Sequence, residues 1–366
     1  MRPAEHTATA GDGSSVDAYL PQLDGLRAIA VLLVLAQHWV TNPLNVPAPL
    51  GFVGVTLFFV LSGYLISRIL IQAKHQQDAG RSSLVGSLKT FYARRFLRIF
   101  PIYYLTIFVL FALDWPNVRD AVWPLVTYTS NLYFLVGGSK LSIEHLWTLA
   151  IEEQYYLIYP LLVLTLGRVG RLRALLAMIA VAFASRFALN LAGVSVSDNK
   201  YFTLSCFDSF ALGGLLAHAE DAVGASRMLS VFRQRMTGLL VAGFTVAMLA
   251  FGFVLGDRLS MRELWFRFVV SVASLYLVGV SRLEPKATLF NRILSLRALQ
   301  YIGKISYGIY LYHLYAPYLV TAVFPAAQDR LVVRVVTFFS ITVLVSALSW
   351  WLVEQPLNRL KKRFSY

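Results

Sequence analysis

The sequence predicts an all-α integral membrane protein, with about ten transmembrane helices in one bundle and both termini in the cytoplasm. Of the 366 residues, 57% are hydrophobic and 14% are charged, and the mean hydropathy is +0.62. Soluble domains contain roughly 25% charged residues. The apolar residues form long segments, and most basic residues lie in the short stretches between them, as in multi-span proteins.

Ten segments have the length of about 17–25 apolar residues that marks a membrane helix. They lie at residues 22–41, 50–71, 98–114, 146–166, 174–192, 202–219, 237–255, 263–281, 300–324 and 331–353. The last helix is expected to end at Glu354 and Pro356, above a basic tail. The segment 120–136 is apolar but contains Pro124 and several hydroxyl residues. It is therefore either an eleventh span or a re-entrant or interfacial segment.

The basic residues between the segments decide the orientation, because cytoplasmic loops are enriched in Lys and Arg. With ten spans and a cytoplasmic N-terminus, the basic clusters within 74–89, 168–173, 227–235 and 282–297 all fall inside. An eleventh span would place every later cluster outside. The exception to the ten-span topology is the external group Arg258, Arg262 and Arg267.

The polar ends define the domain limits. Residues 1–20 are rich in Ala, Gly and Thr and predict a flexible tail, residues 21–358 the membrane domain, and residues 359–366 a basic cytoplasmic tail. The net charge of +14 does not indicate nucleic-acid binding, because the charges lie in loops. The single cysteine, Cys206, excludes an intrachain disulfide. No zinc-type or Walker-type motif is present, so no metal is expected.

The most informative pair is Arg27 and His38, which lie eleven residues apart on an otherwise uncharged apolar segment. Eleven helical steps of about 100° bring both side chains to one face, roughly 16 Å apart along the axis. Taken singly, Arg27 is explained by snorkelling and His38 by an interfacial position beside Trp39. Ionisable groups within a membrane usually face a cavity or a partner. The shared face therefore favours an anion clamp below a reactive centre.

A second cationic group comprises Arg94, Arg95 and Arg98, expected at the cytoplasmic membrane edge. Positive-inside anchoring is the common explanation for such a cluster. Three arginines within five residues also form a fork for phosphates. A phosphorylated ligand from the cytosol would meet both this cluster and Arg27.

Acidic and aromatic residues in the segment 146–166 are candidates for the substrate site. Glu152 and Glu153 lie within the apolar run, where a carboxylate is expected to have a functional partner. Tyr156 shares a helical face with Glu152. Glu144 and His145 precede this run, and solvated loop positions are their simpler explanation.

Two further segments contribute candidates with simpler structural explanations. Ser62 lies among small residues that predict close packing of the second helix on the first. These small residues are Gly51, Gly54 and Gly63. Ser306, Tyr310 and His313 share one side of the segment 300–324, and a structural role is the simpler explanation for His313 alone.

These motifs, in this order, resemble the acyltransferase-3 family of integral membrane acyltransferases, from about residue 20 to residue 360. The matching stretches are LDGLRAIAVLLVLAQH, GFVGVTLFFVLSGYLI, FYARRFLRIFP, HLWTLAIEEQYYLIYP, ISYGIYLYHL and VEQPLNR. Thr148 stands where the family usually has Ser. The resemblance implies the stand-alone form, without a C-terminal hydrolase-like domain, in the inner (plasma) membrane.

The resemblance implies O-acylation of a saccharide or a glycosylated metabolite by acyl-CoA, with acetyl-CoA the expected donor. The family's catalytic histidine corresponds to His38 and its motif arginine to Arg27. The family's arginine cluster corresponds to Arg94, Arg95 and Arg98. The family carboxylate corresponds better to Glu152 than to Glu153.

Together these inferences predict a mechanism. The CoA phosphates would rest on the basic edge, and the pantetheine arm would deliver the thioester toward His38. An imidazole, with an ordinary pKa near 6.5, accepts a hydroxyl proton at neutral pH. Direct attack with His38 as general base and Glu152 orienting it is the first hypothesis, and an acyl-histidine intermediate is the alternative. A multi-span transporter of an anionic or sugar substrate is the alternative function.

Overall fold

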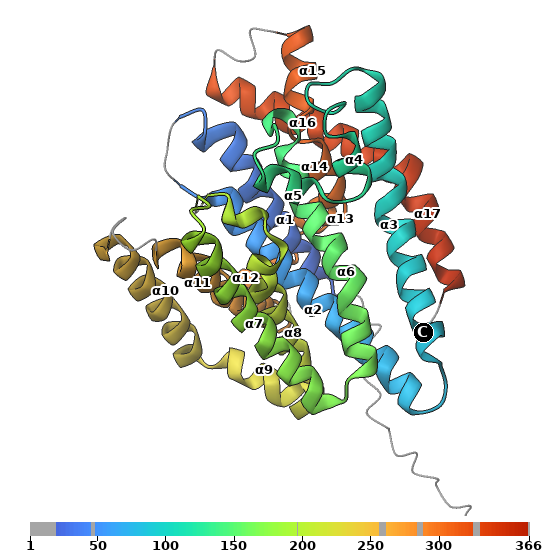
Figure 1. Cartoon of the computed structure of the whole chain (residues 1–366), viewed down its shortest axis with the longest axis vertical. Coiled ribbons are helices and arrows are strands. Elements are labelled where there is room, and N and C mark those ends of the chain that lie inside the picture. Colours follow the sequence, from blue (N-terminus) through green and yellow to red (C-terminus); the bar gives the residue numbers. More distant parts are fainter. Residues whose placement is uncertain are drawn as a thin grey trace, which may run out of the picture.

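The computed structural model describes residues 20–44, 48–195, 197–255, 261–283, 288–324 and 330–364. Every regular element within these ranges is a helix, and the helices form one bundle (Figure 1). The predicted all-α class is therefore confirmed. Residues 1–19, which make up nearly all of the predicted N-terminal tail, lie outside the described residues, and so does Arg258 of the external basic group.

Five helices among the described residues are long and apolar enough to cross a membrane. They are Pro21–Thr41, Leu50–Asp78, Leu84–Ala112, Arg168–Leu191 and Leu331–Leu360. Each coincides with one of the ten predicted spans. The total of ten spans and the cytoplasmic position of both termini stay predictions.

The first half of the bundle contains the long helices that surround the site. In order they are α1 (Pro21–Ala36) with a π-helical turn (Gln37–Thr41), α2 (Leu50–Asp78), α3 (Leu84–Ala112), α4 (Val122–Val126), α5 (Ser130–Leu135), a 3₁₀ turn (Leu141–Leu146), α6 (Trp147–Thr165) and α7 (Arg168–Leu191).

The second half alternates long and short helices. It comprises 3₁₀ turns at Asn199–Tyr201 and Thr203–Cys206, then α8 (Phe207–Val223), α9 (Ala225–Arg233), α10 (Arg235–Leu255), α11 (Met261–Ser281), α12 (Leu289–Leu294), α13 (Arg297–Lys304), α14 (Ser306–Tyr312), α15 (Ala316–Val323), α16 (Leu331–Ser349), a π-helical turn (Trp350–Glu354), α17 (Gln355–Leu360) and a final 3₁₀ turn (Lys361–Arg363).

Helix α2 lies at the centre of the bundle, where it packs against α1, α6, α8 and α11 (Figure 1). A Cβ atom on Gly63 would lie 2.1 Å from the Phe210 carbonyl oxygen, and one on Gly213 would lie 2.0 Å from that of Val60. Only glycine permits this close crossing of α2 and α8. The predicted packing role of the small residues is confirmed: Gly54 faces α1 and Gly51 faces Gln37 of its π-helical turn, whereas Gly63 faces α8.

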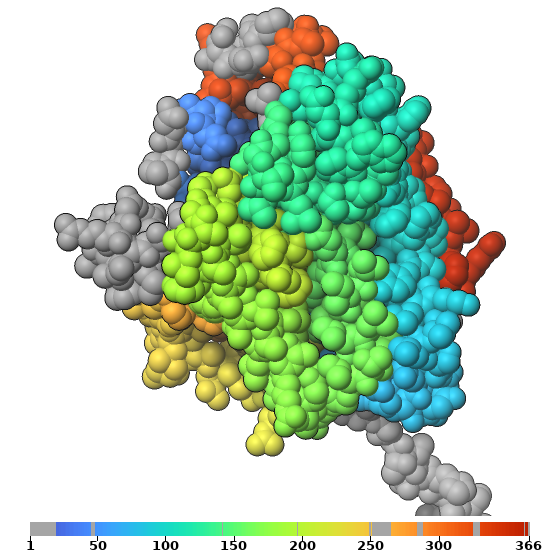
Figure 2. All heavy atoms as spheres, viewed as in Figure 1, coloured from blue at the N-terminus to red at the C-terminus, as the bar shows by residue number. Residues whose placement is uncertain are grey.

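Most of α2 is covered from solvent or lipid on one face of the molecule. Figure 2 shows that the segment between α3 and α6, together with α6 and α7, forms a continuous surface on this face. Several of the largest fully buried side chains, including Phe59, Leu61 and Tyr64, belong to α2. The functional side chains of α2 are therefore held by packing on several sides.

Helix α3 begins at Leu84, far before the predicted start at residue 98. The Ser83 hydroxyl caps it by accepting a hydrogen bond from the Gly86 amide at 3.0 Å. Arg94, Arg95 and Arg98 consequently lie about three turns inside a continuous helix, and not at its beginning. Polar residues at the start of α3 concealed the true start from hydropathy.

The prediction of one continuous helix over residues 300–324 is wrong, because this segment forms three short helices, α13, α14 and α15. Pro317 lacks the amide hydrogen that would bond the carbonyl oxygen of His313. That carbonyl oxygen instead accepts a hydrogen bond from Trp39 Nε1 at 3.2 Å. A side chain of the π-helical turn after α1 therefore supplies the hydrogen bond that the carbonyl group loses at the helix break.

Residues 120–136, predicted to be either an eleventh span or a re-entrant or interfacial segment, do not form a single spanning helix. The segment forms α4 and α5, of five and six residues. Between them Tyr128 adopts a positive φ of 53°, which no α-helix accommodates. The segment therefore does not cross as one helix.

The prediction that the last helix ends at Glu354 and Pro356 is also wrong. A π-helical turn carries the chain from α16 into α17, which continues to Leu360. Pro356 lies in the first turn of α17, directly after the π-helical turn. This arrangement places α17 beside α3 (Figure 1).

Candidate active site

A cavity of about 330 Å³ lies between α1, α2, α3, α6 and α14. Its lining includes Val55 near the start of α2 and Gln72 near the end. These residues are 17 positions apart, which corresponds to about 25 Å along a helix. The cavity is therefore elongated and follows most of α2.

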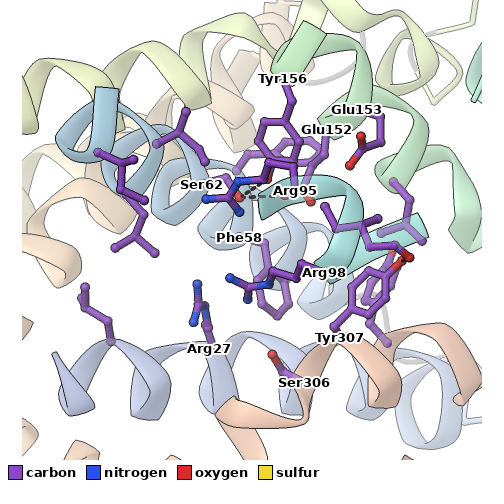
Figure 3. A pocket seen from close by; sticks show the side chains of 18 of the residues that line it. Arg27, Phe58, Ser62, Arg95, Arg98, Glu152, Glu153, Tyr156, Ser306 and Tyr307 are labelled. Atoms are coloured by element: carbon purple, nitrogen blue, oxygen red, sulfur yellow. Dashed lines mark hydrogen bonds between the residues drawn. The ribbon is translucent and has the colours of Figure 1, made fainter. Parts of the chain in front are cut away.

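Nine of the twelve predicted site residues line this cavity. They are Arg27, Ser62, Arg94, Arg95, Arg98, Glu152, Glu153, Tyr156 and Tyr310. Figure 3 shows Arg27, Arg95 and Arg98 pointing into the same space as Glu152. Side chains from five helices, α1, α2, α3, α6 and α14, thus converge on one cavity.

Arginines of α1 and α3 form a basic wall. Arg27 Nη1 donates to Asp24 Oδ1 at 2.8 Å, so its charge is partly compensated on its own helix. Arg95 stacks over the ring of Tyr156 with its guanidinium carbon 5.4 Å from the ring centre. Arg94 Nη1 donates to the Phe364 carbonyl oxygen at 3.3 Å, which ties the C-terminal segment to α3.

Sequence reasoning missed Arg68, which adds a further cation from α2. It lines the cavity, stacks over Tyr64 at 5.6 Å, and lies 3.8 Å from Glu220 of α8. Its position at the end of the segment 50–71 resembled an ordinary interfacial arginine. The α2–α8 crossing, which hydropathy does not report, brings its partner to it.

Carboxylates of α6 lie opposite the basic residues. Ser62 Oγ donates to Glu152 Oε1 at 2.8 Å, and Tyr156 OH donates to Ser62 Oγ at 3.2 Å (Figure 3). Glu153 Oε1 is buried and has no hydrogen-bond partner among the described residues. The chain Tyr156–Ser62–Glu152 therefore fixes one carboxylate at the cavity wall.

The three predicted histidines form a separate cluster beyond the cavity. The ring of His313 lies 5.0 Å from that of His38 and 5.1 Å from that of His145, measured between centroids. His38 belongs to the π-helical turn, His145 to the 3₁₀ turn before α6, and His313 to the end of α14. The structure thus joins residues separated by more than 250 positions.

Backbone contacts assign the tautomers of two of these histidines. His313 Nδ1 bonds the Tyr310 carbonyl oxygen at 2.6 Å, and His145 Nε2 bonds the Leu311 carbonyl oxygen at 3.2 Å. Because a carbonyl oxygen only accepts, these two nitrogens carry the protons. His313 Nε2 and His145 Nδ1 are buried without a partner among the described residues. In the neutral rings these two nitrogens are acceptors.

The structure does not bring Glu152 to His38. Glu152 is held by Ser62 in the cavity, whereas His38 contacts His313. The acidic side chain whose charge acts on His38 is Glu144, which the sequence suggested to be a solvated loop residue. Among the described residues, no contact between Glu152 and His38 supports the predicted role of Glu152 in orienting the His38 ring.

Glu144 belongs to a polar network beside His38. It accepts hydrogen bonds from Lys200 Nζ at 3.0 Å and from Tyr201 OH at 2.5 Å. Burial raises the pKa of Glu144, but Lys200 and Tyr201 lower it by more, so the pKa lies below its ordinary value. Glu144 is therefore an anion at neutral pH.

Residues 20–354, which contain the motifs and the cavity described above, match the family model described as an acyltransferase domain. The chain belongs to the acyltransferase-3 family. The resemblance seen in the motifs is confirmed over nearly the whole membrane domain.

Among known members of the family, the chain is similar to peptidoglycan O-acetyltransferase OatA of Listeria monocytogenes, with 31% identity over 365 residues, covering 93% of this chain and 56% of that protein. It is 29% identical over 371 residues to O-acetyltransferase OatA of Staphylococcus aureus strain NCTC 8325, covering 93% and 57%. A putative O-acetyltransferase of S. aureus strain COL is 29% identical, covering 93% and 58%.

This acyltransferase-3 chain spans a little over half the length of these curated relatives. No solved structure matches it. Among the described residues, no group of three or more His, Cys, Asp or Glu could hold a metal ion, and the expectation of a metal-independent protein stays a prediction.

Proposed function

We propose that the protein transfers a short acyl group, with acetyl expected, from acyl-CoA to a hydroxyl group of a saccharide acceptor. The observation that carries this proposal is the elongated cavity with a basic wall, whose far end lies one tyrosine ring away from the histidine cluster. The O-acetyltransferase names of the relatives support the reaction type. The Listeria relative's printed name makes peptidoglycan the first acceptor to test.

The basic wall suits the donor's phosphates. Planar guanidinium groups bind phosphate oxygens in pairs, and several of them side by side suit a diphosphate. Arg94, Arg95 and Arg98 supply such a set from α3, and Arg27 faces them from α1. The opposite end is lined by Val55, Phe58 and other apolar groups, which suit the pantetheine arm and a short acyl chain.

The chemistry follows from placing the thioester at this apolar end. The acceptor oxygen attacks the carbonyl carbon, the carbon–sulfur bond breaks, and the CoA sulfur leaves as a thiolate that takes up a proton. His38 accepts the hydroxyl proton, because a neutral imidazole is a competent base near pH 7. The ring of His313, 5.0 Å away between centroids, packs against the His38 ring. An acyl-histidine intermediate at His38 is the alternative route.

The predicted topology would place the two substrates on opposite sides of the membrane. The basic end is predicted to open to the cytosol and the histidine cluster to lie toward the outer face of the inner (plasma) membrane. The acceptor would then approach His38 past Glu144 and Lys200, without entering the donor cavity.

The deciding experiment uses the full chain in lipid nanodiscs with radiolabelled acetyl-CoA and peptidoglycan fragments. We expect H38A to lower ester formation by about 10²–10⁴-fold, the usual contribution of a general base. H75A is the matched control, because the His75 side chain is 59% exposed and pairs with Asp221 away from the cavity. Transfer that survives H38A in folded protein would remove His38 from the mechanism.

Two further measurements separate the remaining alternatives. Radiolabel that stays on the protein without an acceptor would favour the acyl-enzyme route over direct attack. Mass spectrometry of cell-envelope glycans and secreted metabolites, with and without the protein, identifies the acceptor by the loss of one ester-linked acyl mass. An unchanged profile in both fractions would contradict acylation of either class.

A further inference from the structure

Tyr310 separates the cavity from the histidine cluster. It lines the cavity, yet its ring centroid lies 5.5 Å from that of His313 and 5.9 Å from that of His145. Tyr310 is 7% exposed, and the ring of Phe58 packs edge-on against it at 6.3 Å. An acyl group in the cavity therefore meets Tyr310 before it can meet a histidine.

Two hydrogen bonds hold this ring in place. Tyr310 OH donates to the His145 carbonyl oxygen at 2.9 Å and accepts from Thr148 Oγ1 at 2.8 Å. Thr148 is 4% exposed and also lines the cavity. Because its hydroxyl is directed to Tyr310, its methyl group is the smallest part that can be removed without releasing the ring.

We propose that Thr148 and Tyr310 form a barrier at the apolar end of the cavity, and that this barrier sets the size of the acyl group transferred. The inference rests on the proposed function, since it concerns the path of the acyl group from donor to acceptor. It assigns a specificity role to two residues and no part in bond making.

The physical basis is close packing. The atoms around the barrier come from α2, α6 and α14, and all are held by helix contacts or hydrogen bonds. A packed apolar pocket discriminates by about tenfold or more for each methylene group. A threonine methyl at the end of the cavity is comparable in size to the difference between neighbouring acyl groups. Its removal should therefore admit the next longer acyl chain.

The test compares acetyl-, propionyl- and butyryl-CoA with the full chain in nanodiscs. T148S keeps the hydroxyl and removes the methyl group, and we expect it to raise the propionyl-to-acetyl ratio of kcat/KM by about tenfold. T148V keeps the bulk and removes the hydroxyl, and we expect a ratio within about twofold of the wild type. T106S is the matched control, because Thr106 is buried on α3, does not line the cavity, and its hydroxyl donates to the Ile102 carbonyl oxygen at 2.8 Å.

The outcomes separate failure of the barrier from failure of the proposed acyl transfer. A wild type that transfers no acyl group from any acyl-CoA to peptidoglycan fragments or polysaccharide overturns both. A wild type that transfers acetyl, with T148S retaining the wild-type ratio, overturns the barrier alone. Should T148S fail to fold, T148A provides the second variant. It removes the methyl group together with the hydroxyl, whose loss alone is measured by T148V, so an unchanged ratio in T148A equally refutes the barrier.

Discussion

Removing the hydrogen bond from Ser62 to Glu152 tests whether the cavity takes part in acyl transfer. Ser62 Oγ lies 2.8 Å from Glu152 Oε1 and also accepts from Tyr156 OH. S62A removes both bonds without adding bulk. A hydrogen bond to a charged group is worth about 1.5–3 kcal/mol, and 1.36 kcal/mol corresponds to tenfold in rate. If Glu152 must be held during transfer, we expect kcat/KM for acetyl transfer to fall by about 10- to 100-fold.

A matched control lies five residues further along the same helix. Ser67 is buried, donates to the Gly63 carbonyl oxygen at 2.6 Å, and lies 2.6 Å from Tyr159 OH, but it does not line the cavity. S67A should therefore perturb packing without changing kcat/KM per folded molecule. The assay measures radiolabelled ester with protein quantified by size exclusion in detergent. Equal kcat/KM values for S62A and S67A would refute a functional role for this hydrogen bond.

Two other predictions concern stability. Arg186 Nη2 and Asp208 Oδ2 lie 2.7 Å apart, and their side chains are 3% and 0% exposed. D208N leaves the arginine charge buried without its partner, so we expect the free energy of unfolding to fall by about 3–5 kcal/mol and the thermal unfolding midpoint in detergent to fall with it. An unchanged midpoint would contradict this. The Glu144–Lys200 contact should weaken in acid. Burial raises the pKa of Glu144, but Lys200 and Tyr201 together lower it by more, so the pKa lies below its ordinary value of 4.5. The stabilisation is therefore present above pH 4.5 and lost as the pH falls through the lowered pKa. E144Q should flatten that acid dependence, and an identical pH profile would count against it.

Hydropathy identified the class and five spans that the structure bears out, because a membrane helix must satisfy its backbone internally and present apolar side chains over a fixed length. It failed where polar residues extend a helix, as at the start of α3. It failed again where a proline divides an apolar run, as at Pro317. Apolar content reports the environment of a segment and not the continuity of its hydrogen bonds.

Motif order selected the residues of the site, but not their grouping. Nine predicted residues line one cavity, as a shared role suggested, whereas His38 and Glu152 lie in different surroundings. The sequence analysis did not single out Arg68, and it interpreted Glu144 as a solvated loop residue. Only their partners, Glu220 on α8 and Lys200 before α8, distinguish them, and sequence spacing carries no information on such distant pairs.

The sequence by itself determined the membrane class, the family and the candidate site residues, because these follow from composition and from local motifs. The tertiary structure alone decided that the arginines and carboxylates share a cavity while the histidines stand behind Tyr310. The physical reason is that the crossings of α2 with α8 and of α1 with α13 depend on backbone contact at glycines such as Gly213 and Gly303. Close approach between helices fixes side-chain neighbours that no periodicity along one helix can specify.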